Sequence, residues 1–215
     1  MDLAKYIEHT NLNENATKED IKRLCEEALK YGFYGVCVYP KFVKYAKSLV
    51  DDKCKVITVI GFPSGTTTTE EKVKEAKHAI IDDADELDMV INLDALIEDR
   101  DEKYVKKDIK SVVDAALHRP VKVIIEAGVL SDEEKRLAIN WAIEAGASFI
   151  KTSTGKIPNK GATIEDIKLI KSIIAERKLG IKAAGGISDK YTALALIDAG
   201  ATKIGASKSI EIIGG

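Results

Sequence analysis

The 215-residue sequence predicts an α/β fold: a single-domain (β/α)8 TIM barrel over residues 1–215, with an extra N-terminal helical segment. Short apolar runs rich in Val, Ile and Phe alternate with amphipathic segments whose outer faces are charged, which indicates strand–helix units. Eight such units fit in this length, the number that a closed barrel needs. The strands are also almost continuously apolar, as expected of parallel strands covered on both faces.

The expected strands each end at glycine, proline or a small polar residue. Seven are clear, at residues 35–40, 55–63, 86–92, 121–128, 148–155, 180–186 and 202–207. An eighth, around residues 7–10, precedes the first long helix, residues 18–31. Further helices are expected at residues 41–50, 69–81, 104–117, 131–145, 163–177 and 188–199.

Several helix ends carry recognisable capping chemistry. Ser131 with Glu134, and Thr163 with Asp166, fit the pattern in which a hydroxyl and a carboxylate satisfy free backbone N–H groups. The threonine run 66–69 is expected to cap the helix that follows it. Glycines stand where helices should stop, at Gly32, Gly146 and Gly200.

An open doubly wound sheet is the alternative fold. The dinucleotide fingerprint G-x-G-x-x-G does not follow an early strand, and the phosphate-loop pattern G-x-x-x-x-G-K-[ST] does not occur in the sequence. The barrel is therefore favoured.

The composition excludes several classes of function. With 33 basic and 35 acidic residues the net charge is −2, so we expect no nucleic-acid partner. Cys25, Cys37 and Cys54 form no CxxC pair, which indicates reduced thiols. Without a secretory signal pattern or an apolar run of about 18 residues, we expect a cytoplasmic protein that has no membrane partner.

Lys151 and Lys182 stand at the carboxyl ends of neighbouring strands. In barrel enzymes the loops that carry the chemistry converge there. A lone lysine at a strand end is ordinarily solvated, as we expect for Lys55, Lys122 and Lys203 at the strand starts. For the pair, burial and a second positive charge disfavour the ammonium form, which predicts a nucleophilic amine suited to Schiff-base chemistry.

Asp88 lies between Leu87 and Met89 inside an apolar strand. Burial of a lone carboxylate is costly, so we expect it to be paired or hydrogen-bonded. It is either a catalytic group or part of a structural ion pair with a lysine across the barrel. Asp85 and Glu86 precede the strand and are expected to be solvated.

Small residues after the last three strands predict an anion site. Glycine lets backbone N–H groups approach an anion closely, and phosphate sites after strands 7 and 8 are frequent in this fold. A phosphate monoester is therefore expected there, with Lys208 nearby. Its candidate ligands are Gly155, Lys156, Gly185, Gly186, Gly205 and Ser207.

Other conspicuous residues have plainer interpretations. His9 ends the first strand and could line the pocket, whereas His78 and His118 are far apart in sequence, and no H-x-H or H-E-x-x-H spacing predicts a metal site. Trp141 and Cys37 are expected to pack in the core.

The motifs IEHTNL, GVCVYP, VITVIGFPSG, ADELDMVIN, VKVIIEAG, FIKTSTG, GIKAAGGI and IGAS, taken in order, resemble those of the deoxyribose-phosphate aldolase family over nearly the whole chain. The resemblance implies a metal-independent Schiff-base aldolase on a (β/α)8 barrel, without a cofactor. Its reaction is the reversible cleavage of 2-deoxy-D-ribose 5-phosphate to D-glyceraldehyde 3-phosphate and acetaldehyde.

By this resemblance Lys151 matches the Schiff-base nucleophile. Lys182 matches the second lysine, which perturbs the pKa of the pair and joins a proton relay, and Asp88 matches the proton donor and acceptor of that relay. The six candidate ligands align with phosphate-binding positions. The chain differs from the family pattern at Ala127, where many members have threonine, at Lys208, often serine, and in its IIGG end, which lacks the terminal tyrosine of some members.

Two alternatives stay open at this point. Another class I aldolase of the same fold would use a different donor, such as pyruvate or dihydroxyacetone, and a non-catalytic barrel would bind a sugar phosphate without forming an imine. The resemblance also implies small-molecule partners, namely a sugar phosphate and aldehydes, and a homo-oligomer, dimer or tetramer.

Overall fold

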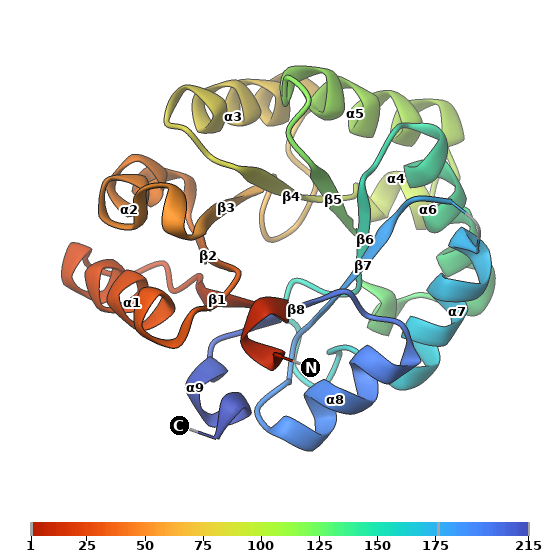
Figure 1. The fold of residues 1–215 in the computed structure, drawn as a ribbon. Helices are drawn as coiled ribbons and strands as arrows, with labels where there is room; N and C mark the ends of the chain where they lie inside the picture. Colours follow the sequence, from red (N-terminus) through yellow and green to blue (C-terminus); the bar gives the residue numbers. More distant parts are fainter. Residues whose placement is uncertain (1, 176, 215) are drawn as a thin grey trace.

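The computed structural model describes residues 2–175 and 177–214, in which eight parallel strands close into a barrel surrounded by helices (Figure 1). Each strand pairs with the next along the chain, and the last pairs with the first. The strands are β1 (Ile7–Asn11), β2 (Gly35–Val38), β3 (Lys55–Ile60), β4 (Glu86–Val90), β5 (Val121–Ile124), β6 (Phe149–Lys151), β7 (Gly180–Ala184) and β8 (Lys203–Ala206). The predicted barrel is confirmed.

The helices form the outer ring of Figure 1. They are α1 (Lys18–Tyr31), α2 (Val43–Val50), α3 (Thr69–Ile81), α4 (Leu93–Ile97), α5 (Glu102–Ala115), α6 (Asp132–Glu144), α7 (Ile164–Ile174), α8 (Lys190–Ala199) and α9 (Ser209–Ile213). Single 3-10 turns are η1 (Leu3–Tyr6), η2 (Pro40–Phe42), η3 (Asp51–Lys53) and η4 (Ala127–Val129). The extra N-terminal segment is η1.

The helix ends follow the capping chemistry of the sequence. Ser131 and Glu134 form a reciprocal capping box at the start of α6, and Thr68 from the threonine run does the same at α3. Gly32 ends α1 in the left-handed conformation, with φ +68°. The short helices α4 and α9, five residues each, were not predicted, because five residues are too few to show a helical period.

The main apolar core lies between the barrel and the helices. Alternate strand residues such as Leu87, Met89 and Ile150 point outward into it, and Trp141 packs there as predicted. The barrel interior holds a second, small apolar cluster, which includes Cys37. The interior also holds a group of charged side chains, and these form the candidate site.

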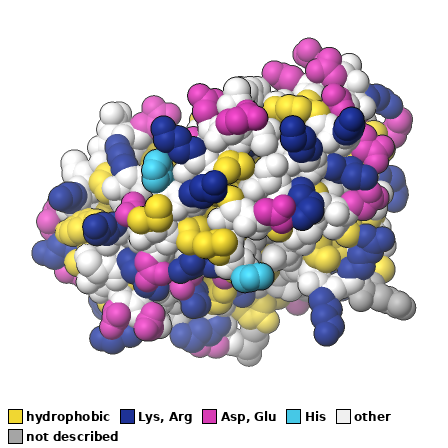
Figure 2. All heavy atoms as spheres, turned by 90° about the horizontal axis from the view of Figure 1, so that it is seen from above, with side chains coloured by type: hydrophobic (Ala, Val, Ile, Leu, Met, Phe, Trp, Pro, Cys, Tyr) yellow, Lys and Arg dark blue, Asp and Glu magenta, His cyan; other side chains and the backbone are white. Residues whose placement is uncertain are grey.

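The surface shows no strong separation of charge on the face drawn in Figure 2, where lysine and arginine side chains are interspersed with aspartate and glutamate. This fits the net charge of −2. Within residues 2–175 and 177–214, no helix combines the length and the apolar character needed to cross a membrane.

Candidate active site

The strands bring the three predicted chemical residues together inside the barrel. Lys151 ends β6 and is the register partner of Lys182 on β7, while Asp88 on β4 is the register partner of Lys122 on β5. All four side chains are at most 3% exposed. They face inward because their strand neighbours, such as Leu87 and Ile150, face the outer core.

Asp88 is the centre of this arrangement. Its Oδ2 accepts hydrogen bonds from Lys182 Nζ at 2.6 Å and from Lys151 Nζ at 2.9 Å. Its Oδ1 accepts from Lys122 Nζ at 3.0 Å. One carboxylate oxygen therefore stands between the two lysines that the sequence paired.

A further layer of charge lies beneath Asp88, towards the amino ends of the strands. Glu8 on β1 accepts a hydrogen bond from Lys182 and lies 3.5 Å from Lys122 Nζ. Glu86 lies 2.5 Å from the same Lys122 Nζ and accepts a 2.5 Å hydrogen bond from the Tyr34 hydroxyl. We call Glu8, Glu86, Asp88, Lys122, Lys151 and Lys182 the barrel cluster.

The expectation that Lys122 and Glu86 are solvated is wrong, since Lys122 is 0% and Glu86 4% exposed. Val121 and Val123 face the outer core, so strand alternation turns Lys122 inward, and Glu86 is in phase with Asp88 on β4. The same two-residue alternation in the sequence could have predicted that Lys122 and Glu86 point into the barrel. Glu8 was not among the predicted site residues. Its strand neighbour Ile7 faces the outer core, so the same alternation turns Glu8 into the barrel.

Lys55 and Lys203, the other lysines at strand starts, are less buried than Lys122, but only Lys55 of the two lies mainly in solvent. The side chain of Lys55 is 51% exposed and pairs with Asp85 at 3.1 Å. Asp85 is itself half-buried rather than fully solvated, because it also accepts a hydrogen bond from the backbone N–H of Val56. Lys203 is half-buried, with its Nζ 3.9 Å from the centroid of the Tyr34 ring.

The charges of the barrel cluster favour the ionised forms of Asp88, Lys122 and Lys182. Burial alone would raise the pKa of Asp88, but Lys122, Lys151 and Lys182 outweigh it and hold that pKa well below its usual range. Burial alone would lower the pKa of Lys182, but Asp88 and Glu8 outweigh it and raise that pKa. The carboxylates also raise the pKa of Lys122. Lys182 is therefore a permanent positive charge beside Asp88.

Space for Lys182 depends on Gly205. A Cβ at Gly205 on β8 would come within 2.9 Å of Lys182 Cε. Glycine at this position therefore has a packing role, besides lining the cavity described next.

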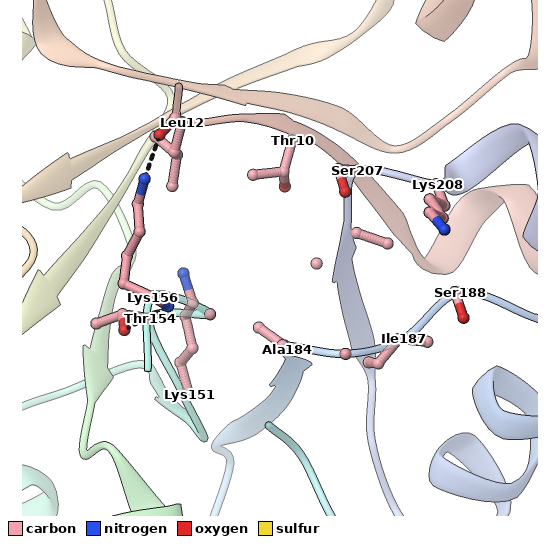
Figure 3. A pocket seen from close by; sticks show the side chains of 15 residues that line it. Thr10, Leu12, Lys151, Thr154, Lys156, Ala184, Ile187, Ser188, Ser207 and Lys208 are labelled. Atoms are coloured by element: carbon pink, nitrogen blue, oxygen red, sulfur yellow. Dashed lines mark hydrogen bonds between the residues drawn. The ribbon is translucent and has the colours of Figure 1, made fainter. Parts of the chain in front are cut away.

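A cavity of about 460 Å³ opens above Lys151, at the carboxyl ends of the strands (Figure 3). This volume is in the range of small-molecule sites. Lys151 lines it, and the two glycines after β7, Gly185 and Gly186, have positive φ angles of +89° and +74°. The cavity brings together all six predicted phosphate ligands: Gly155, Lys156, Gly185, Gly186, Gly205 and Ser207.

Lys156 lies along one side of this cavity, with its Nζ donating to the Leu12 carbonyl oxygen at 2.6 Å (Figure 3). Lys208 also lines the cavity, as expected from its place in the sequence. The positive charges of Lys156 and Lys208 make this cavity favourable for an anion.

The loop after β6 is anchored by Glu126, a residue that the sequence reading missed. Buried Glu126 accepts hydrogen bonds from the Thr154 hydroxyl at 2.5 Å and from the Thr154 N–H at 3.2 Å. It has a left-handed backbone, with φ +54°. Glu126 thus fixes the segment that runs from Lys151 to Gly155.

His9 does not line the cavity above Lys151. It lines an adjoining recess of about 490 Å³, which shares Thr10, Leu12, Lys156 and Ser207 with that cavity. His78 and His118 lie on the exposed surface. In the described part of the chain, no group of three or more His, Cys, Asp or Glu side chains is arranged to hold a metal ion.

Cys25, Cys37 and Cys54 are buried free thiols. Cys37 faces the barrel interior, and burial raises its pKa to about 11. The thiol is therefore protonated at neutral pH and packs as a small apolar group, as predicted.

Comparison with known proteins gives one consistent result. The model of the DeoC/LacD family of aldolases matches residues 3–213. A curated deoxyribose-phosphate aldolase of Thermococcus gammatolerans is 54% identical over 220 residues, which cover 100% of this chain and 96% of the relative. A crystal structure from Coccidioides immitis is similar with a TM-score of 0.95 at 37% identity, covering 99% of this chain and 85% of the other.

A second solved structure is a tetrameric deoxyribose-phosphate aldolase from Aeropyrum pernix. It is similar with a TM-score of 0.90 at 32% identity, and the match covers 99% of this chain and 89% of the other.

Proposed function

This chain belongs to the DeoC/LacD family of aldolases, and from that premise we propose that it is a deoxyribose-phosphate aldolase. It would reversibly cleave 2-deoxy-D-ribose 5-phosphate to D-glyceraldehyde 3-phosphate and acetaldehyde. One observation carries the proposal: Lys151 is almost fully buried, yet it lines the floor of the cavity and hydrogen-bonds to an ionised Asp88.

In the proposed reaction the unprotonated amine of Lys151 attacks the C1 aldehyde of the open-chain sugar phosphate. Water leaves and a protonated imine forms. Asp88 Oδ2, 2.9 Å from Lys151 Nζ, is close enough to exchange protons with this amine.

The imine then withdraws electrons from the C2–C3 bond. Asp88, acting through an ordered water shared with Lys182, accepts the proton of the C3 hydroxyl, and glyceraldehyde 3-phosphate departs. The remaining enamine is protonated at carbon and hydrolysed, which releases acetaldehyde and the free lysine. Lys182, held charged by Asp88 and Glu8, stabilises the ionised form of the Asp88 carboxylate before it accepts this proton and after it has released it.

The phosphate of the substrate would bind at the glycine-rich rim of the cavity. Backbone N–H groups near Gly155, Gly185 and Gly186, together with the cation of Lys156, supply donors and positive charge there. The phosphate is remote from the bond that breaks, so its binding energy positions the chain. We expect a higher kcat/KM for deoxyribose 5-phosphate than for deoxyribose, and equal values would contradict this subsite.

Borohydride reduction in the presence of acetaldehyde, followed by peptide mass mapping, tests the nucleophile. The expected result is one ethyl adduct on the peptide that contains Lys151. Trapping with pyruvate or dihydroxyacetone instead would indicate another class I aldolase. Ligand-dependent stabilisation without any adduct would indicate a binding protein.

We also propose that the chain forms a homo-oligomer. The Aeropyrum pernix structure is a tetramer, and this chain exposes large apolar side chains, among them Tyr191 (85%) and Ile81 (77%). Light scattering that gives the mass of one chain, 23.4 kDa, would contradict this proposal.

A further inference from the structure

A histidine outside the cavity connects three elements around the loop after β8. His9 lies on β1, is 4% exposed, and is the register partner of Ala206 at the end of β8. Its Nδ1 lies 2.9 Å from the Ser209 hydroxyl, and its Nε2 lies 2.9 Å from Glu27 Oε2 on α1. The proposed reaction uses none of these three side chains.

Ser209 is the first residue of α9 and is fully buried. Its hydroxyl contacts two groups at 2.9 Å, the Ala206 carbonyl oxygen and His9 Nδ1, and it can donate its single proton to one of them at a time. Between Ala206 and Ser209 stand Ser207 and Lys208, which both line the cavity above Lys151 (Figure 3). The two ends of this cavity-lining segment are therefore tied to one hydroxyl.

The α9 helix cannot hold this segment by itself. Five residues are far fewer than a helix needs to be stable alone in water, and Lys208, at the N-cap position, makes no capping hydrogen bond through its side chain. Contacts with the rest of the fold must set the position of Ser209. Its side-chain contact with β1 is the hydrogen bond with His9.

The imidazole of His9 is itself held in one orientation. A carboxylate can only accept, so Nε2 carries a proton and donates it to Glu27. The Phe33 ring packs against the imidazole, with ring centroids 5.3 Å apart. The ring is thus fixed on two sides, and Nδ1 is directed at Ser209.

We propose that His9 is a positioning residue for substrate phosphate, acting through Ser209 to hold Ser207 and Lys208 at the rim of the cavity. A binding segment that is ordered before the ligand arrives loses less entropy on binding. The inference rests on the proposed function, and in particular on the phosphate subsite. On this inference, the contacts that join Glu27, His9 and Ser209 help to determine how strongly the enzyme prefers phosphorylated over unphosphorylated sugar.

The test compares kcat and KM for deoxyribose 5-phosphate and for deoxyribose in three variants. Ser209→Ala removes the bridge. His9→Gln places its amide nitrogen near the Nε2 position and keeps the Glu27 contact, whereas His9→Asn places it near Nδ1 and keeps the Ser209 contact. Ser209→Ala and His9→Gln should raise KM for the phosphorylated sugar about three- to tenfold and leave kcat and the reaction of deoxyribose unchanged. His9→Asn should retain most of the wild-type preference.

His78→Asn, a change of an exposed histidine on α3, is the matched control and should have no effect. Equal loss of activity on both sugars would indicate a general structural role and overturn the inference. Wild-type KM values in Ser209→Ala and His9→Gln would also overturn it. So would a larger rise in KM for the phosphorylated sugar in His9→Asn than in His9→Gln. The proposed function fails separately, if the wild type forms no borohydride adduct or shows no preference for the phosphorylated sugar.

Discussion

The protein buries lysine in two places, and the two differ in access. In the barrel cluster, Lys151, Lys182 and Lys122 share Asp88, and Lys151 reaches the cavity. Between α3 and α5, Lys72 pairs with Asp108 at 2.6 Å, with side chains 0% and 1% exposed. We call Lys72 and Asp108 the helix pair.

The helix pair is closed and complete. Lys72 Nζ also donates to the Val90 carbonyl oxygen at 3.1 Å, and Asp108 accepts from the Thr69 hydroxyl at 2.8 Å. Burial lowers the pKa of Lys72, an effect that Asp108 offsets in part. Neither residue of the pair lines the cavity above Lys151. A buried lysine therefore indicates chemistry when a substrate can reach it, and burial alone does not.

The largest expected effect is at Lys151. Lys151→Met removes the proposed nucleophile and should reduce kcat on the order of 10⁴-fold or more, with no adduct after borohydride treatment. The fold should persist, because methionine fills similar volume and Asp88 keeps two cationic partners. Near wild-type turnover in Lys151→Met would remove the distinction between the two lysine sites.

Lys182→Leu should come second. Asp88 loses its closest hydrogen-bond donor, at 2.6 Å, and Glu8 loses its donor as well. We expect kcat to fall about 10²- to 10⁴-fold, as for a group that assists proton transfer. Steady-state kinetics combined with a circular dichroism spectrum would check this result, and full activity with a native spectrum would contradict the proposed relay.

Lys72→Met should affect stability instead of chemistry. It leaves the Asp108 carboxylate buried without its cation, which costs about 3–5 kcal/mol of unfolding free energy. The double variant Lys72→Met with Asp108→Leu should recover most of that loss. Urea unfolding measures both, and kcat at a temperature where each variant is folded should stay within about twofold of wild type. A large loss of kcat would show that the helix pair has a functional role.

The smallest expected effect is on the pH dependence of the free energy of unfolding, which has opposite signs for Lys182 in the barrel cluster and Lys72 in the helix pair. Lys182 has a folded-state pKa above the ordinary 10.5, so its contribution to stability is complete below pH 10.5 and is lost as pH rises beyond it. Lys72 has a folded-state pKa below 10.5, so stability rises with pH in the window that ends at 10.5.

Urea unfolding across this alkaline range should therefore show opposite changes. In Lys182→Met the decline above pH 10.5 should be shallower than in wild type, whereas in Lys72→Met the gain just below pH 10.5 should be missing. Lysines outside the barrel cluster and the helix pair are common to all three proteins and do not contact the substituted side chains, so their contribution cancels. The same change in both variants would contradict the assigned directions.

Most strands and helices of the barrel could be predicted from the sequence, because the barrel repeats one pattern of buried strand and amphipathic helix. The sequence also predicted the positions of Lys151, Lys182 and the six candidate phosphate ligands, because these residues stand where strands end. The prediction that Lys122 and Glu86 are solvated is wrong, because the two-residue alternation of a strand turns both side chains into the barrel although they stand near strand starts. The links of His9 to Ser209 and of Glu126 to Thr154 join segments 200 and 28 residues apart, and no local pattern encodes them.

The barrel cluster contains three carboxylates and three lysines, so its formal charges cancel when every member is ionised. In the proposed reaction this balance holds when position 151 carries the iminium of a bound intermediate and Asp88 is ionised. When the side chain at position 151 is a neutral amine or enamine, the balance holds if Asp88 carries the proton, as it does in the proposed reaction once the C3 hydroxyl has lost its proton. Asp88 and the side chain at position 151 can therefore share one proton without changing the total charge of the barrel cluster, whereas a permanently neutral side chain at position 151 would leave the cluster anionic as long as Asp88 is ionised.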